Sequence, residues 1–250
     1  MDTIEEKAAR FIAVKEIGSV LCEHCLYFGR RQTDLELERI WCRRAPDPSF
    51  TQNNGSFVGY EALKKYYAGA ENRRKARYDE ILSSLEPEMA DQPDELRYGT
   101  NTLSLQTLST PCVEIAGDME TAKGLWTVSA QVTAVDETGP VGLWAYGKLA
   151  ADLVREDGTW RIWHLAVYTD FVTPAGMEFD PEKGAAVYPA GLGIEETPTV
   201  PGGHYDLYTD VRPLQKTPMP PVPYRTFSGT FSYGPNYRHA LRTDRRDGEV

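Results

Sequence analysis

Residues 155–171 read REDGTWRIWHLAVYTDF. The Asp-Gly pair in this stretch forms a tight turn between two long runs rich in apolar and aromatic residues, which is a strong local signal for a β-hairpin. The first arm of this hairpin begins near residue 142, another long strand covers 121–135, and shorter extended pieces cover 100–117. The second half of the chain is therefore predicted to be a meander of antiparallel strands.

The first half of the chain has a helical period instead. Residues 4–30 contain no proline and carry an apolar stripe at alternating spacings of three and four. A short helix is expected after Asp34, and a second long helical segment covers 61–85. Helices followed by a meander predict an α+β fold, with helices packed on the concave face of a curved antiparallel sheet. The stripe consists of Val14, Ile17, Leu21, His24 and Phe28.

Three pieces of the chain resemble the nuclear transport factor 2-like superfamily, also called SnoaL-like or scytalone-dehydratase-like. They are TDLELERIW at 33–41, GSFVGYEALKKYY at 55–67 and the hairpin at 155–171. The resemblance extends over roughly residues 4–173 and implies a cone-shaped pocket domain at 1–173. These motifs mark a fold and not a reaction, because the superfamily includes dehydratases, isomerases, cyclases and binding proteins.

The remaining residues, 174–250, are rich in Gly, Pro and Tyr. Aromatic side chains in such number are seldom left in water, so we expect an extended arm that is ordered on its own or a neighbouring subunit. The arm is predicted to end in a solvated basic tail around Arg238 and Arg246. His204, which follows two glycines in the arm, is a candidate for a lid over a neighbour's pocket.

A narrower resemblance concerns the strand AKGLW at 122–126 and the tail PPVPYRTFSGTFSYGP at 220–235. Both are similar to bacterial lyases of lignin-derived diaryl propanoids, the lignin-dimer gamma-formaldehyde lyase group. This resemblance implies a lyase that releases formaldehyde from the side chain of the substrate and leaves a stilbene-type product. Two alternatives stay open: a dehydratase, isomerase or polyketide cyclase of the same fold, and a non-catalytic small-molecule binder or assembly subunit.

Alternation along the last strand supplies most of the catalytic candidates. If Trp160 and Ile162 face the core, a period of two places His164, Tyr168 and Asp170 on the same pocket wall. The residues that alternate with these along the strand would then form an outer face suited to contact between subunits. We therefore expect a homo-oligomer, either a dimer or a trimer. That outer face would contain Trp163, Leu165 and Val167.

The first helix supplies the other candidates, because His24 interrupts its apolar stripe and Tyr27 lies one position away from it. Histidine can accept and donate a proton near neutral pH, and a tyrosine hydroxyl can donate to a developing oxyanion. The resulting hypothesis makes His164 the base and either His24 or Tyr27 the acid, with Tyr168 and Asp170 as orienting groups. It requires no metal or organic cofactor.

An aromatic substrate would be bound by aromatic and cationic side chains near these groups. An aromatic core needs no ligand, however, and the face on which Lys148 lies depends on the hairpin register. The binding candidates are Phe28, Trp126, Trp144, Tyr146 and Lys148.

Composition excludes several other classes of protein. The 250 residues carry a net charge of −10, which disfavours a nucleic-acid partner. No run of 18 apolar residues and no N-terminal apolar leader segment occurs, so we expect a cytoplasmic protein without a membrane span. The CxxC pair Cys22 and Cys25 has no second ligand pair, and the chain lacks phosphate-loop, dinucleotide-binding, GxSxG and HExxH motifs.

Overall fold

The computed structural model describes residues 3–85, 87–100, 102–136, 139–176, 196–202, 205–213 and 215–235. His204 and the basic tail lie outside the described residues. The helices are α1 Ile4–Gly29, α2 Thr33–Arg39, α3 Tyr60–Leu85 and α4 Asp94–Gly99. The strands are β1 Ser49–Gln52, β2 Gly55–Val58, β3 Ser104–Ile115, β4 Thr121–Asp136, β5 Gly139–Glu156, β6 Thr159–Pro174 and β7 Val200–Pro201.

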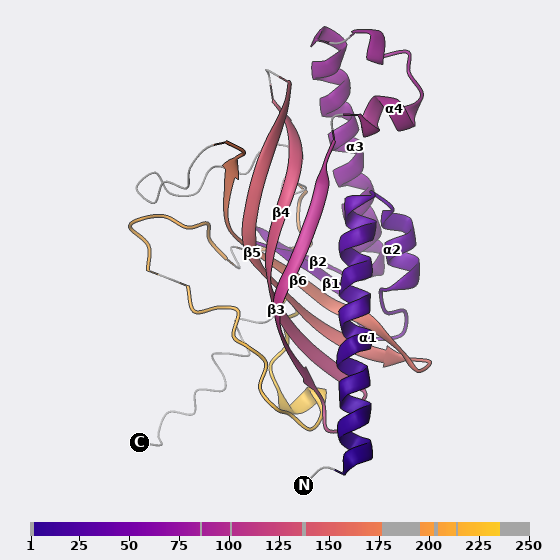
Figure 1. Ribbon diagram of the computed structural model, residues 1–250, viewed down its shortest axis with the longest axis vertical. Helices are drawn as coiled ribbons and strands as arrows, with labels where there is room; N and C mark the ends of the chain where they lie inside the picture. Colours follow the sequence, from indigo (N-terminus) through magenta and orange to yellow (C-terminus); the bar gives the residue numbers. More distant parts are fainter. Residues whose placement is uncertain are drawn as a thin grey trace.

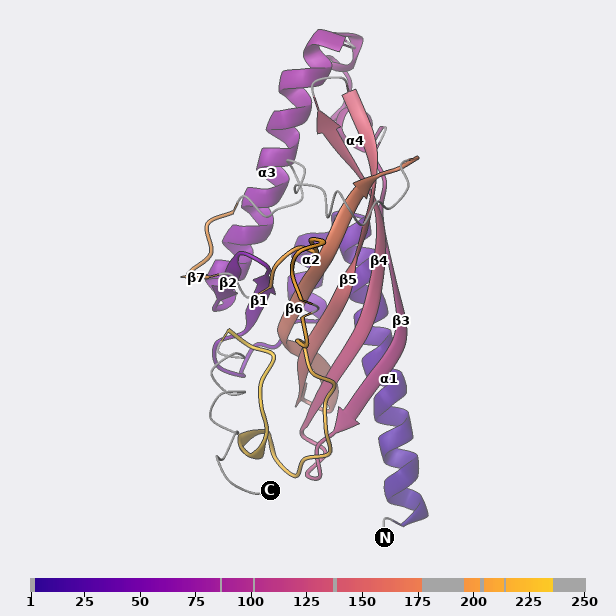
Figure 2. The same cartoon turned by 90° about the vertical axis from the view of Figure 1, so that its left-hand side faces the viewer.

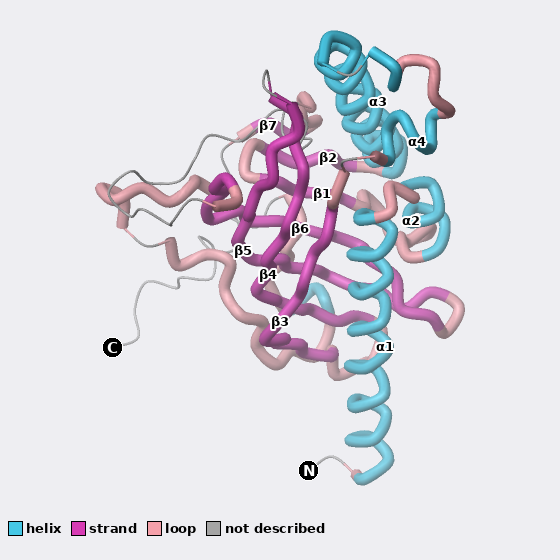
Figure 3. The backbone as a smooth tube through the Cα atoms, turned by 45° about the horizontal axis from the view of Figure 1, so that its top comes forward, coloured by secondary structure: helices cyan, strands magenta, loops and turns pink. Residues whose placement is uncertain are grey.

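The strands form one curved sheet in the order β3-β4-β5-β6-β1-β2-β7. All neighbours pair antiparallel except β1 and β6, which are parallel. Helices α1, α2 and α3 lie on one side of the sheet, which is here called the inner face (Figures 1 and 3). The arm, residues 205–235, runs across the opposite, outer face (Figure 2). The predicted α+β class, with helices on a curved and mainly antiparallel sheet, is confirmed.

Helix α1 begins with a capping box, in which Thr3 Oγ1 accepts from the Glu6 N–H and the Glu6 carboxylate accepts from the Thr3 N–H. Of the predicted stripe, Ile17, Leu21 and His24 are buried, whereas Phe28 is half-buried and Val14 is exposed. Ala13 and Val20 complete the buried face of the helix. No helix among the described residues is both long and apolar enough to cross a membrane.

The hairpin at 155–171 forms as predicted between β5 and β6. Asp157 and Gly158 have φ values of 51° and 77°, as a two-residue turn with both central residues left-handed requires. The Glu156 carboxylate, at the end of β5, accepts three backbone N–H groups from the segment after α2. These donors belong to Arg43, Arg44 and Ala45, at 2.9, 2.8 and 3.0 Å.

A β-bulge just after the hairpin changes the faces of β6. Ile162 pairs with Leu153, but His164 pairs with Asp152, which leaves Trp163 as an extra residue on β6. An extra residue in a strand of period two exchanges the faces of everything beyond it. Ile162 and Leu165 therefore both lie in the main core beneath the helices.

The predicted pocket wall on β6 is therefore wrong. His164, Tyr168 and Asp170 lie on the outer face, whereas Leu165 and Val167, expected outside, pack in or against the main core. Strict alternation from Trp160 could not anticipate the bulge. Trp163 does lie outside, where its ring contacts the Phe227 ring of the arm in a tilted arrangement with centroids 4.4 Å apart.

A second, smaller core lies between the outer face and the arm. Aromatic side chains from the arm pack there against small residues of β5 and β6. Its buried members are Ala150, Ala166, Tyr168, Tyr205, Phe231 and Tyr233. Backbone hydrogen bonds also hold the arm, because the Gly117 N–H donates to the Tyr224 carbonyl and the Tyr208 N–H to the Asp170 carbonyl.

Candidate active site

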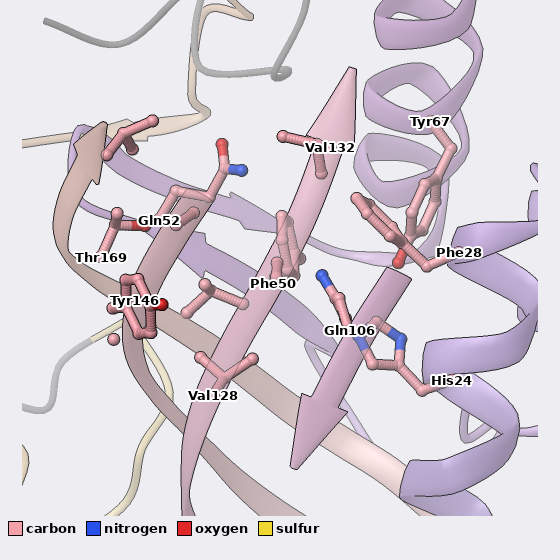
Figure 4. A pocket seen from close by; sticks show the side chains of 15 residues that line it. His24, Phe28, Phe50, Gln52, Tyr67, Gln106, Val128, Val132, Tyr146 and Thr169 are labelled. Carbon is pink, nitrogen blue, oxygen red and sulfur yellow. The ribbon is translucent and has the colours of Figure 1, made fainter. Parts of the chain in front are cut away.

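A cavity of about 100 Å³ lies between α1, α3 and the inner face of the sheet. One water needs roughly 10–15 Å³ by this measure, so the cavity has room for several waters or for part of a larger organic ligand. Its walls are mainly apolar, from Phe28, Phe50, Val128, Ala130, Val132, Val167 and Val172. The polar side chains that line it are His24, Gln52, Tyr67, Gln106 and Thr169 (Figure 4).

His24 is placed in the cavity by the C-terminal part of α1. It continues the buried stripe of that helix and is only 2% exposed. Its Nδ1 lies 2.8 Å from Glu36 Oε1 on the neighbouring helix α2. Figure 4 shows His24 and Gln106 of β3 reaching into the same space, beside Tyr67 of α3.

Glu36 is fully buried and collects hydrogen bonds on a single oxygen. Besides His24, its Oε1 accepts from the Tyr67 hydroxyl at 2.8 Å and from the Trp41 indole N–H at 3.2 Å. Burial, followed by the nearby charge of Glu36, raises the pKa of Tyr67 well above its ordinary value, so this phenol stays protonated as a donor. Within the described part of the chain, Glu36 Oε2 has no hydrogen-bond partner.

This arrangement fixes which imidazole nitrogen can react. Because Nδ1 faces a carboxylate oxygen, Nδ1 carries the hydrogen in the neutral ring, and Nε2 is the free acceptor. A carboxylate behind the ring also stabilises the imidazolium that forms once Nε2 has taken a proton. The pair of His24 and Glu36 is thus equipped to act as a general base in a largely apolar enclosure.

Two amide side chains add unused hydrogen-bonding capacity to the cavity. Gln52 donates to the Tyr66 hydroxyl at 3.0 Å, but its Oε1 is buried without a partner among the described residues. The same holds for Oε1 of Gln106. A few convergent polar groups in an apolar cavity are typical of a small-molecule site.

When the chain is compared with known protein families, residues 9–166 match the SnoaL-like domain, and this is more than half of the chain. The chain belongs to the SnoaL-like domain family. A search of curated proteins found no match.

Solved structures similar to this SnoaL-like protein have low sequence identity to it. One is a type-3 hexachlorocyclohexane dehydrochlorinase from Novosphingobium barchaimii, with TM-score 0.48, 15% identity, and coverage of 70% of this chain and 99% of that one. Another is a type-2 enzyme of the same name, with TM-score 0.48, 16% identity, and coverage of 70% and 97%. A third, of unknown function, is from Mycobacterium tuberculosis, with TM-score 0.42, 16% identity, and coverage of 65% and 74%.

Some of the residues predicted from the sequence do reach the cavity. His24 and Phe28 line it, and so does Tyr146, which is 37% exposed and stacks on Phe171. Trp126 instead fills the main core, and Trp144 is half-buried and stacks on Tyr146.

Tyr27 is not among the cavity-lining residues. It packs against the main core, and its hydroxyl lies 3.5 Å from a carboxylate oxygen of Glu23.

The other predicted site residues lie on the outer face. Nζ of Lys148 bonds both carboxylate oxygens of Asp170 at 2.7 Å and the Tyr205 hydroxyl at 2.9 Å, so Lys148 is not a cation of the cavity. His164 Nδ1 lies 2.8 Å from Oδ2 of the buried Asp152.

Asp152 is the centre of a buried cluster that holds the arm. It accepts from Lys123 Nζ at 2.6 Å, from the Ser232 hydroxyl at 2.7 Å and from the Tyr233 N–H at 2.8 Å. Ser232 and Asp152 approach the same nitrogen of His164, so this is not the geometry of a serine nucleophile, which needs the two ring nitrogens for separate partners.

Three residues of the site were not predicted from the sequence: Glu36, Trp41 and Tyr67. The available signal was Glu36, an acidic residue adjacent to Leu37 and four residues before Ile40, two apolar residues that are also buried. In the described part of the chain, no three His, Cys, Asp or Glu side chains gather as a metal site would require.

Proposed function

We propose that this SnoaL-like protein is a cofactor-independent lyase that acts on a small aromatic substrate by acid–base catalysis, with His24 as the base. The observation that carries the proposal is the buried His24, whose Nδ1 is held by Glu36 so that Nε2 is the acceptor in the cavity. Among the described lining residues there is no Ser, Cys or Lys, which favours proton transfer over covalent catalysis.

The walls of the cavity support an aromatic substrate. Phe28, Phe50 and several valines offer flat and apolar contact, while Gln52 and Gln106 offer hydrogen bonds to hydroxyl groups. Tyr67 donates its single hydroxyl hydrogen to Glu36 Oε1, so it holds the carboxylate behind His24 in place.

The narrower form of the proposal is the cleavage of a lignin-derived diaryl propanoid. Nε2 of His24 takes the proton of the terminal hydroxyl, and the bond between the terminal carbon and its neighbour breaks. The released electron pair forms the new carbon–carbon double bond, and the benzylic hydroxyl leaves as water with the proton returned by His24. The products are formaldehyde, water and a stilbene, and no oxidant is required.

The test is to incubate the metal-stripped protein with a diaryl propane-1,3-diol. Formaldehyde is measured with a colorimetric trap, and the conjugated product by its absorbance. Formaldehyde and stilbene in equal amounts would support the narrower proposal. A conjugated product without formaldehyde would replace it with a dehydratase or isomerase. Tight binding of the diol without any product would indicate a non-catalytic binding protein and overturn the catalytic proposal.

A further inference from the structure

A second cavity, of about 80 Å³, opens beside the first and shares Phe28, Tyr67 and Val132 with it. Its distinctive lining residues are Arg31 and Glu71. Arg31 follows the end of α1, three residues beyond Phe28 and seven beyond His24. The same segment of chain therefore passes from the proposed base to a guanidinium group.

The guanidinium of Arg31 is poorly satisfied by its neighbours. Its contact with Glu71 is 3.6 Å long, and the Glu71 carboxylate is already held by two hydrogen bonds from Arg74, at 3.0 and 2.7 Å. Arg74 in turn donates to the Tyr98 carbonyl. Two guanidinium groups and one carboxylate leave one positive charge uncompensated, and within the described residues no hydrogen bond reaches the Arg31 side chain.

That surplus charge is partly removed from water. The Arg31 side chain is 30% exposed, and burial followed by the charge of Arg74 lowers its pKa. A half-buried cation is stabilised by an anion that supplies both charge and hydrogen bonds. The chain as a whole carries a net charge of −10, so this local excess of positive charge does not follow from the overall composition.

We propose that Arg31 binds a carboxylate group of the ligand whose aromatic body occupies the cavity beside His24. The planar fork of a guanidinium matches a carboxylate through two parallel N–H···O bonds, and a single negative charge balances the single surplus positive charge. A phosphate dianion would bring a second charge that nothing in the cluster compensates. The inference rests on the proposed function, because it names the class of substrate for that site: aromatic carboxylic acids.

The experiment compares two probes of the same shape, trans-cinnamate and its neutral amide, trans-cinnamamide. Their affinities are measured by isothermal titration calorimetry for the wild type, Arg31→Gln and Arg30→Gln. Arg30 is the matched control, because it is the exposed neighbour of Arg31 in sequence. Thermal unfolding checks that each variant is folded.

The wild type and Arg30→Gln are expected to bind cinnamate about tenfold or more tightly than cinnamamide, since hydrogen bonds between charged groups are the strong ones. Arg31→Gln should lose this preference and keep its affinity for the amide. If Arg31→Gln fails to fold, Arg31→Lys should retain part of the preference. Added salt should weaken the binding of cinnamate alone.

Equal affinities in the wild type would overturn the proposal. So would a preference that survives in Arg31→Gln, or the binding of neither probe. Because the readout is binding, this test is separate from that of the proposed function. A preference for cinnamate without cleavage of the diol would support the Arg31 subsite and contradict the proposed lyase activity. Cleavage of neutral diols without a preference for cinnamate would support the lyase activity and contradict the subsite.

Discussion

Among the single residues of the site, one buried imidazole and the carboxylate behind it determine the proposed chemistry. His24 could be predicted because a polar side chain on the apolar stripe of a long helix stands out in the sequence. Glu36 could not be assigned to it, because the contact joins two helices whose relative placement depends on the whole core. The hydrogen bonds of Tyr67 and Trp41 to Glu36 depend on the same packing.

Glu36→Gln should lower kcat and leave KM nearly unchanged. The amide keeps the shape of the side chain but cannot stabilise the imidazolium or enforce one tautomer, so we expect a loss of roughly 10²- to 10⁴-fold. Steady-state kinetics on the proposed diaryl propane-1,3-diol substrate is the measurement. Glu38→Gln, an exposed change on the same helix, serves as the control. An unchanged kcat in Glu36→Gln would remove the carboxylate from the mechanism.

At the scale of elements, the sequence predicted the types of helix and strand well and the faces of β6 poorly. The Asp-Gly turn has a local cause, since its left-handed backbone suits those residues, and it was predicted correctly. The bulge at Trp163 has no comparable local signature, because it depends on how β6 pairs with β5. Its effect was large, since it moved the candidate His164 from the inner to the outer face.

The hairpin is fixed to the rest of the cone by Glu156, so Glu156→Ala should destabilise the protein. Three backbone N–H groups would lose a charged acceptor, and we expect a cost of roughly 2–4 kcal/mol in the free energy of unfolding. Urea denaturation of the variant and of the exposed control Glu120→Ala measures this cost.

The pH dependence of that cost follows from the pKa of Glu156. Burial acts to raise this pKa, but the three backbone hydrogen bonds outweigh burial and hold it below its ordinary value of 4.5. A carboxyl group with a depressed pKa stabilises the fold above the ordinary value, and this contribution is lost as the pH falls through the depressed one. The gap between wild type and Glu156→Ala should therefore be full at pH 7 and shrink below about pH 4. A gap that does not change with pH would contradict the assigned hydrogen bonds.

At the scale of the whole molecule, the sheet separates two environments. The inner face carries the main core and the cavity, and the outer face carries the second core beneath the arm. The aromatic content of the arm predicted an ordered segment. It did not predict that Asp152 of β5 would accept hydrogen bonds from the Ser232 hydroxyl and the Tyr233 N–H of the arm. The oligomeric state remains a prediction. Leu165 and Val167, expected on the face that contacts another subunit, instead pack in or against the main core.

Asp152→Asn should destabilise the protein strongly and loosen the arm. Burial alone would raise the pKa of Asp152, but the charge of Lys123 and the hydrogen bond with His164 outweigh it and lower that pKa, so this residue is the buried counter-charge. Its loss leaves Lys123 buried and unpaired, which costs about 3–5 kcal/mol. Denaturation and hydrogen exchange of the Tyr233 amide measure the effect, with the exposed Asp210→Asn as control. Unchanged protection of that amide would show that Asp152 does not hold the arm.

A side-by-side kinetic comparison of His24→Asn and His164→Asn tests whether the chemistry occurs at His24 inside the cone. Both imidazoles are buried, and each bonds an acidic side chain through Nδ1, so the two changes are matched in kind. We predict that folded His24→Asn loses at least 10²-fold in kcat while folded His164→Asn keeps wild-type turnover. The reverse result would place the active site on the outer face and contradict the account.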